Sequence, residues 1–85
     1  MTHLLMKAQQ HHRYWSTHRE EGRHHLFAAS WALGEAVAKL ENSGWPDFAN
    51  HIREVALSLE RYTTSEVQAK VGSWLSRMEL LGVGR

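Results

Sequence analysis

The stretch HLFAASWALGEAVAKLE, residues 25–41, is the longest mostly apolar segment of this 85-residue chain. Two apolar stripes run through it with the 3.6-residue period of an α-helix. The first stripe is formed by Leu26, Leu33, Val37 and Leu40. The second stripe, directly beside it, is formed by Phe27, Trp31, Gly34 and Ala38. Only a narrow polar strip remains, so a helix of this kind has to be covered from more than one side.

Two interpretations of this helix stay open at the level of the sequence. In the first it is a core helix covered by its own chain, with Trp31 buried, as Trp74 is expected to be on the last helix. In the second, Ser30, Gly34 and Ala38, at four-residue spacing, let the backbone of a second copy approach closely. The second interpretation predicts self-association.

The rest of the chain predicts a single helical domain over residues 1–85, with helices near 3–21, 24–42, 46–62 and 64–81. Gly22 is expected to break the chain, although one continuous helix over residues 3–42 is the alternative. Gly44 is expected to close the central helix, and Pro46 to begin the next. Thr63 and Glu66 have the spacing of a capping box. The predicted fold class is all-α, a small antiparallel bundle of three to four helices.

The small size of the domain predicts a homodimer. A chain of 85 residues buries only part of its surface and often gains stability by oligomerising. The sequence has no cysteine, which excludes a disulfide scaffold, thiolate metal ligands and a cysteine nucleophile, and a reducing cytoplasm is the expected location. The N-terminal apolar run is too short for a signal peptide, and Glu35 interrupts the only other apolar candidate. We therefore expect a soluble cytoplasmic protein that does not enter a membrane.

Histidines are concentrated in the first 25 residues, at His3, His11, His12, His18, His24 and His25. His18, Glu21 and His25 would share one helical face and are weak candidates for a metal site. No HExxH motif accompanies them, and Gly22 interrupts the face. Exposed or half-buried structural histidines are the favoured interpretation, with a pH-sensitive or anion-contacting face as the further alternative. No cofactor is expected.

Signatures of catalysis are missing from the sequence. There is no G-x-S-x-G elbow and no glycine-rich phosphate loop, and the only aspartate, Asp47, stands at the start of a predicted helix. We therefore expect a protein that is not an enzyme.

A DNA-binding interpretation rests on residues 65–81. Residues 65–71, a turn at Gly72 and residues 73–81 would form a helix-turn-helix with Arg77 exposed, as in a dimeric regulator. The net charge is only +1, and the would-be recognition helix offers one arginine and one glutamate, a poor complement for phosphates. One unbroken amphipathic helix would explain the same residues.

The leading hypothesis is a non-enzymatic protein-binding module, an adaptor, anti-activator or inhibitor of the kind found in phage and other mobile elements. Its predicted contact residues are Tyr14, Trp15, Arg19 and Trp45, because aromatic and arginine side chains are enriched at protein interfaces. Under this hypothesis, Trp15→Ala weakens partner binding with little change in melting temperature.

Overall fold

A computed structural model describes residues 1–20 and 22–83 of the chain. Four α-helices form it: α1 (Thr2–Thr17), α2 (Arg23–Asn42), α3 (Pro46–Leu57) and α4 (Thr64–Leu81). A short 3₁₀ helix, η1 (Leu59–Arg61), joins α3 to α4. The described residues contain no strand, and the predicted all-α class is confirmed.

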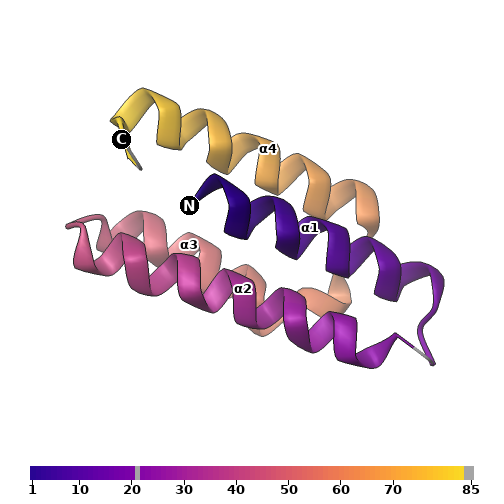
Figure 1. Cartoon of the computed structure of the whole chain (residues 1–85). Coiled ribbons are helices and arrows are strands. Elements are labelled where there is room, and N and C mark those ends of the chain that lie inside the picture. The colour runs from indigo at the N-terminus through magenta and orange to yellow at the C-terminus, as the bar shows by residue number, and fades with distance from the viewer. Residues whose placement is uncertain (21, 84–85) are drawn as a thin grey trace.

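Consecutive helices run in opposite directions along an elongated body (Figure 1). The body measures 38 × 19 × 19 Å along its principal axes. α1 packs against both α2 and α4, and α2 packs against α3. The α1–α2 turn therefore lies at one end of the molecule, and the α2–α3 turn lies at the other.

The turn between α1 and α2 depends on a glycine. α1 ends at Thr17, earlier than predicted, because His18 leaves the helical conformation at φ −134° and ψ 57°. The Gly22 N–H donates a hydrogen bond to the His18 carbonyl oxygen at 2.6 Å. A Cβ atom at Gly22 would lie only 2.7 Å from that same oxygen, so a larger residue does not fit. The predicted break at Gly22 is confirmed, and the alternative of one helix over residues 3–42 is wrong.

The turn between α2 and α3 also follows the prediction. Gly44 has φ 86°, a left-handed conformation that glycine adopts without steric cost. The Trp45 N–H then donates back to the Leu40 carbonyl oxygen at 2.8 Å, which closes α2. Pro46 begins α3 directly afterwards.

The third helix is shorter than the predicted 46–62 segment. Ser58 departs from helical geometry, with φ −129°, and its hydroxyl donates to the Glu54 carbonyl oxygen at 3.0 Å. Such a local bond competes with continuation of the helix. The chain resumes as η1, and Leu59 still points into the core at 3% exposed.

The start of α4 is a capping box, as predicted. The Glu66 N–H donates to Thr63 Oγ1 at 3.2 Å, and the Thr63 N–H donates to Glu66 Oε1 at 3.0 Å. The bond that the Glu66 carboxyl accepts from the Thr63 N–H also lowers the pKa of that carboxyl.

Thr63→Ala is expected to reduce the free energy of unfolding by about 1 kcal/mol, because it leaves the N–H of Glu66 without its acceptor. Urea titration monitored by circular dichroism measures this change. Thr64→Ala is the matched control, since Thr64 is the first residue inside the helix, and it should change stability much less. An equal loss in both variants would contradict the role of the cap.

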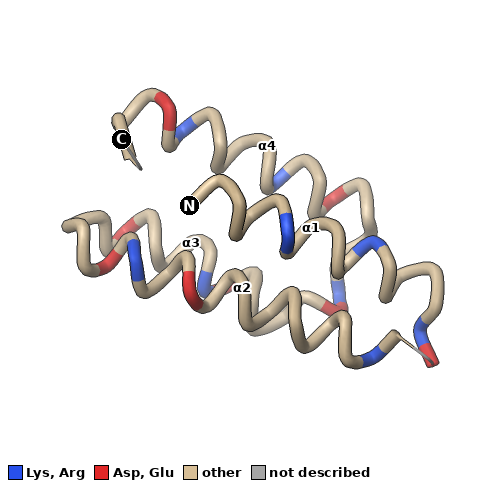
Figure 2. Tube along the Cα trace, in the orientation of Figure 1, with Lys and Arg blue, Asp and Glu red and all other residues tan. Residues whose placement is uncertain are grey.

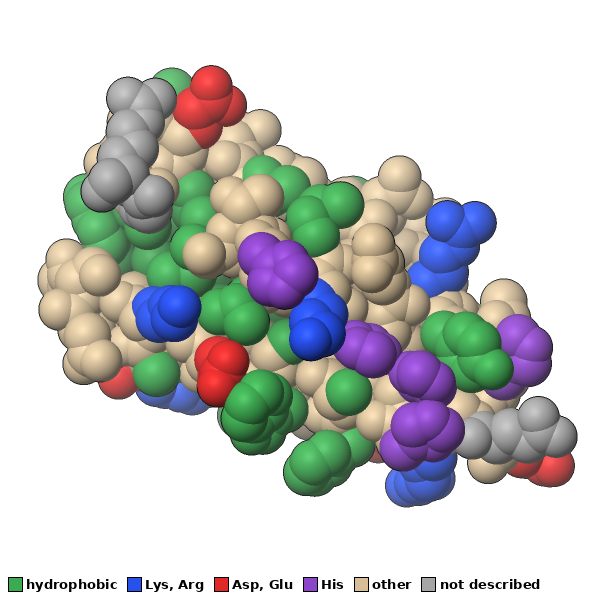
Figure 3. Space-filling view, viewed as in Figure 1, with side chains coloured by type: hydrophobic (Ala, Val, Ile, Leu, Met, Phe, Trp, Pro, Cys, Tyr) green, Lys and Arg blue, Asp and Glu red, His purple; other side chains and the backbone are tan. Residues whose placement is uncertain are grey.

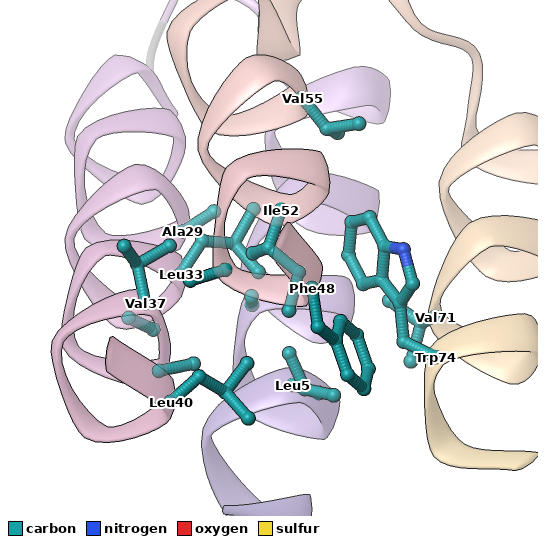
Figure 4. Packing of buried hydrophobic residues seen from close by; sticks show 14 of the residues in the cluster. Leu5, Ala29, Leu33, Val37, Leu40, Phe48, Ile52, Val55, Val71 and Trp74 are labelled. Carbon is teal, nitrogen blue, oxygen red and sulfur yellow. The ribbon is translucent and has the colours of Figure 1, made fainter. Parts of the chain in front are cut away.

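The core is a single cluster drawn from all four helices and η1. Its buried apolar members are Leu5, Ala8, Ala29, Ala32, Leu33, Ala36, Val37, Leu40, Phe48, Ala49, Ile52, Val55, Leu59, Val67, Val71, Trp74 and Met78. Figure 4 shows Phe48 of α3 beside Trp74 of α4, and Leu33 of α2 beside Ile52 of α3. Trp74 is 7% exposed, as predicted for a core tryptophan.

The last helix runs unbroken through Gly72. An added Cβ atom at Gly72 would meet nothing within 4 Å, so the glycine lies in open space and marks no turn. The guanidinium carbon of Arg77 lies 5.5 Å from the ring centroid of Phe48, over the side of the bundle. The alternative of a helix-turn-helix over residues 65–81 is therefore wrong, and the interpretation of that segment as one unbroken amphipathic helix is confirmed.

Candidate protein-interaction surface

The four predicted contact residues do not form one surface. Tyr14 and Arg19 lie at or next to the end of α1, near the α1–α2 turn, whereas Trp45 follows the opposite end of α2. The length of α2, about 30 Å, therefore separates Tyr14 and Arg19 from Trp45. Trp45 is half-buried and packs against the core cluster. Of these residues, Tyr14 is 48% exposed and Arg19 is exposed as well.

The expectation that Trp15 stands on the surface is wrong. Its side chain is only 6% exposed, and it lies on the inward side of α1. The guanidinium carbon of Arg19 lies 4.9 Å from the Trp15 ring centroid, so the arginine covers the ring. The polar neighbours of Trp15 in sequence suggested exposure, but its four- and seven-residue spacing from His11 and Ala8 places it on the inner face.

Trp31 departs from the prediction in the opposite direction. It was expected in the core, yet its side chain is 61% exposed, and that of Phe27 is 74% exposed. Both belong to the second apolar stripe of α2, which stays largely exposed, although Trp31 also borders a hollow that it shares with Leu4 of α1. Large exposed aromatic side chains on one helix face are uncommon on a protein surface and mark interaction sites. We call this stripe, with Phe27, Trp31, Gly34 and Ala38, the outer face of α2.

Two shallow grooves flank the small residues of the outer face. One groove, with a volume of about 350 Å³, lies between α2 and α3 and includes Leu57, which is 83% exposed. The other, of about 520 Å³, lies along α2 beside Phe27 and Trp31. Both grooves share the three small residues Ser30, Gly34 and Ala38. Figure 3 shows hydrophobic side chains that protrude along the lower edge of the molecule, on the side where α2 lies in Figure 1.

Few charges interrupt the outer face. Glu41 and Arg53 form an ion pair across the groove between α2 and α3, with side chains 41% and 46% exposed. Arg53 also donates from Nη1 to Asn50 Oδ1 at 2.6 Å. Figure 2 shows basic and acidic positions spread over the whole bundle, with basic residues but no acidic one along α1. The outer face is therefore largely apolar, with Glu35 lining the groove beside Trp31 and one ion pair at the margin toward α3.

A histidine cluster occupies the side of the molecule where α1 meets the first turn of α2 (Figure 3). The Nδ1 atoms of His11 and His25 are 2.8 Å apart, so one of them carries a proton and donates to the other. The His25 ring also lies 4.3 Å from the Tyr14 ring and 4.2 Å from the His24 ring, between centroids. Desolvation lowers the pKa of His25 most, and the neighbouring His24, His11 and His18 lower it further.

His12 is the buried polar residue of α1. Its side chain is 0% exposed, and Nε2 lies 3.2 Å from the Leu59 carbonyl oxygen, which can only accept. The Nε2–H therefore donates, and the neutral ring leaves Nδ1 buried without a hydrogen-bond partner. Burial lowers the pKa of His12, because a charged ring would lose its hydration. Nothing in the sequence distinguished His12 from the surface histidines except its seven-residue spacing from Leu5.

The weak metal candidates are only partly within the described structure. His18 stacks on Tyr14 at 4.5 Å, and His25 pairs with His11, while Glu21 lies outside the described residues. Among residues 1–20 and 22–83, no three metal-ligating side chains converge on a common point.

The helices of the described ranges include none with the length and apolar character needed to cross a membrane. Comparison with protein-family models, curated proteins and solved structures finds no match to this chain.

Proposed function

We propose that this chain is a non-enzymatic protein-binding module, an adaptor, anti-activator or inhibitor that acts by occupying another protein's surface in the cytoplasm. The observation that carries the proposal is the exposure of Phe27 and Trp31 side by side on the outer face of α2. Tryptophan and other large aromatic side chains dominate the binding energy of protein interfaces. Neither ring is needed by the core, which is complete without them. We therefore assign these two rings a role in binding another chain.

The site differs from the contact residues that the sequence suggested. The outer face of α2 and the neighbouring Leu57 replace Trp15 and Trp45 as the centre of the surface. Tyr14 and Arg19 lie at the α1–α2 turn, beyond the Phe27 end of this face, and belong to its margin at most. The homodimer predicted from the small core is a form of the same proposal, in which the surface occupied belongs to a second copy.

Trp31→Ala is expected to reduce partner binding at least tenfold, because hot-spot residues contribute about 2 kcal/mol or more and 1.4 kcal/mol is a factor of ten. Stability should change by no more than about 0.5 kcal/mol, because the ring is 61% exposed. Tagged protein is used to capture partners from a bacterial lysate with and without nuclease, mass spectrometry identifies them, and binding is then measured with the purified partner.

Leu80→Ala is the matched control, since Leu80 is 87% exposed on α4, outside the outer face of α2. It should retain the partner as the unaltered chain does. Retention that is unchanged by Trp31→Ala would contradict the proposed surface. Loss of every retained protein after nuclease treatment would contradict a protein partner and favour nucleic acid.

A further inference from the structure

We infer that the outer face of α2 binds the same face of a second copy of this chain, with the two α2 helices antiparallel. This inference rests on the proposed function, because it names an occupant of the same surface. It is carried by the distribution of large and small side chains along α2 and by the charges at the two ends of that helix.

The outer face is shaped to fit itself in the antiparallel direction. The protruding rings, Phe27 and Trp31, lie in the N-terminal half of the face, and the small residues Gly34 and Ala38 lie in the C-terminal half. A single antiparallel register sets Phe27 opposite Ala38 of the second copy and Trp31 opposite its Gly34. The twofold axis repeats each contact. Every protruding ring then lies over a small residue.

The hollow over Gly34 is open in the single chain. A Cβ atom added at Gly34 would meet nothing within 4 Å, and both grooves of the outer face pass over this residue. In the antiparallel register the two Trp31 rings lie near the twofold axis, each over the Gly34 of the other copy. A parallel pairing would instead set Phe27 against Phe27 and leave the hollows unfilled.

Charge complementarity favours the same direction. The first turn of α2 contains Arg23 and no acidic residue, whereas its last turn contains Glu41 together with the basic residue Lys39. The register that seats the rings also brings Arg23 beside Glu41 of the second copy, on the same flank of the helix pair. Glu41 pairs with Arg53 of its own chain but remains 41% exposed, so it can accept a second cation. Antiparallel helix dipoles add to this preference, because each basic N-terminal end meets a C-terminal end.

The area that the outer face of α2 can bury indicates how tightly two copies would bind. α2 has 20 residues. A helix of that length is about 30 Å long and about 10 Å wide, and a pairing based on one such face buries less than the roughly 800 Å² per partner of a standard interface. We therefore expect a reversible dimer with a dissociation constant in the micromolar range rather than an obligate one.

Sedimentation velocity over a concentration series tests the dimer directly. The unaltered chain should shift from its monomer mass of 9.8 kDa to twice that mass as concentration rises. Gly34→Leu fills the hollow and should weaken dimerisation at least tenfold. Gly72→Leu is the matched control, because Gly72 is also a helical glycine with open space around its Cβ position, but it lies on α4. This control should dimerise as the unaltered chain does.

A charge exchange tests the direction of pairing. Arg23→Glu and Glu41→Arg should each weaken the dimer several-fold, and the double variant R23E/E41R should recover most of the lost affinity. Recovery is specific to an antiparallel pair, because only there does residue 23 of one copy lie beside residue 41 of the other. Because Glu41→Arg also removes the ion pair with Arg53 and sets two cations together, the exchange is made in an Arg53→Ala background, and failure of the double variant to recover there would overturn the antiparallel register.

The remaining outcomes separate this inference from the proposed function. An unaltered chain that stays monomeric at every concentration, or a dimer unaffected by Gly34→Leu, would overturn the inference. If a different protein is then captured by the unaltered chain and lost with Trp31→Ala, the proposed function stands and the occupant of the face is that protein. If neither a dimer nor a Trp31-dependent partner is found, both proposals fail.

Discussion

Replacing Trp15 by alanine is expected to lower the free energy of unfolding by about 3 to 5 kcal/mol. The ring is 6% exposed, so its removal leaves a cavity between α1 and the rest of the bundle. The substitution also removes the cation–π contact of Arg19, whose guanidinium carbon lies 4.9 Å from the ring centroid. Thermal and urea unfolding monitored by circular dichroism would measure the change. The result would be the reverse of the sequence-based expectation, in which Trp15→Ala affects binding and leaves stability intact.

Trp31→Ala provides the comparison within the same residue type. That ring is 61% exposed, so its removal should change the free energy of unfolding by no more than about 0.5 kcal/mol. Equal destabilisation by the two substitutions would show that the outer face of α2 is part of the core. A stable Trp15→Ala variant would show that the α1 helix packs in a different rotation.

Acidification below about pH 6.5 is expected to destabilise the protein, because His12 and His25 both have a lowered pKa in the folded chain. Above that pH both rings are neutral whether the chain is folded or not, and their full contribution to stability is present. As the pH falls below about 6.5, the unfolded chain binds protons that the folded chain resists. Stability therefore falls with pH until the lowered pKa values of the folded state are reached. Urea unfolding at a series of pH values between 7 and 5 would measure this slope.

His12→Gln separates the buried histidine from the others. The glutamine amide can still donate to the Leu59 carbonyl oxygen but does not titrate, so the slope of stability against pH should be reduced. His12→Leu, by contrast, removes the side-chain donor, and the carbonyl keeps only the bond from the Tyr62 N–H at 3.2 Å, so it should cost about 1 kcal/mol at neutral pH. His51→Gln is the control, because His51 is exposed on α3, and its slope should match that of the unaltered chain. An unchanged slope in His12→Gln would assign the pH dependence to the cluster around His25.

The sequence predicted the helices better than it predicted which faces are covered. The boundaries at Gly22, Gly44 and Thr63 follow from local chemistry, since glycine and capping residues act within one turn of the helix. The sequence misplaced both Trp15 and Trp31, because their burial depends on contacts between segments that are distant in the chain. Periodicity shows that a helix has apolar stripes, but only the packing of distant segments decides which stripe is buried.

The position of Trp31 shows why the candidate site could not be predicted in full. The sequence contained both apolar stripes of α2 and offered self-association as one interpretation of the second stripe. It could not show that α1 and α3 both lie against the first stripe and leave Phe27 and Trp31 exposed. The burial of His12 has the same origin, because its partner is the backbone of Leu59, which is distant in sequence.

The contact between α1 and α4 has a consequence for the order of folding. α1 meets α2, and α2 meets α3, across short turns, so these pairs can form as soon as each helix is made. α4 has to return to α1 across most of the chain, and closing that long loop carries the largest entropic cost. We expect α4 to dock last, and until it does, the side of α1 that packs against α4 is presented to water. Nascent chains of this protein would then be most exposed to misassociation just before residues 64–81 are available.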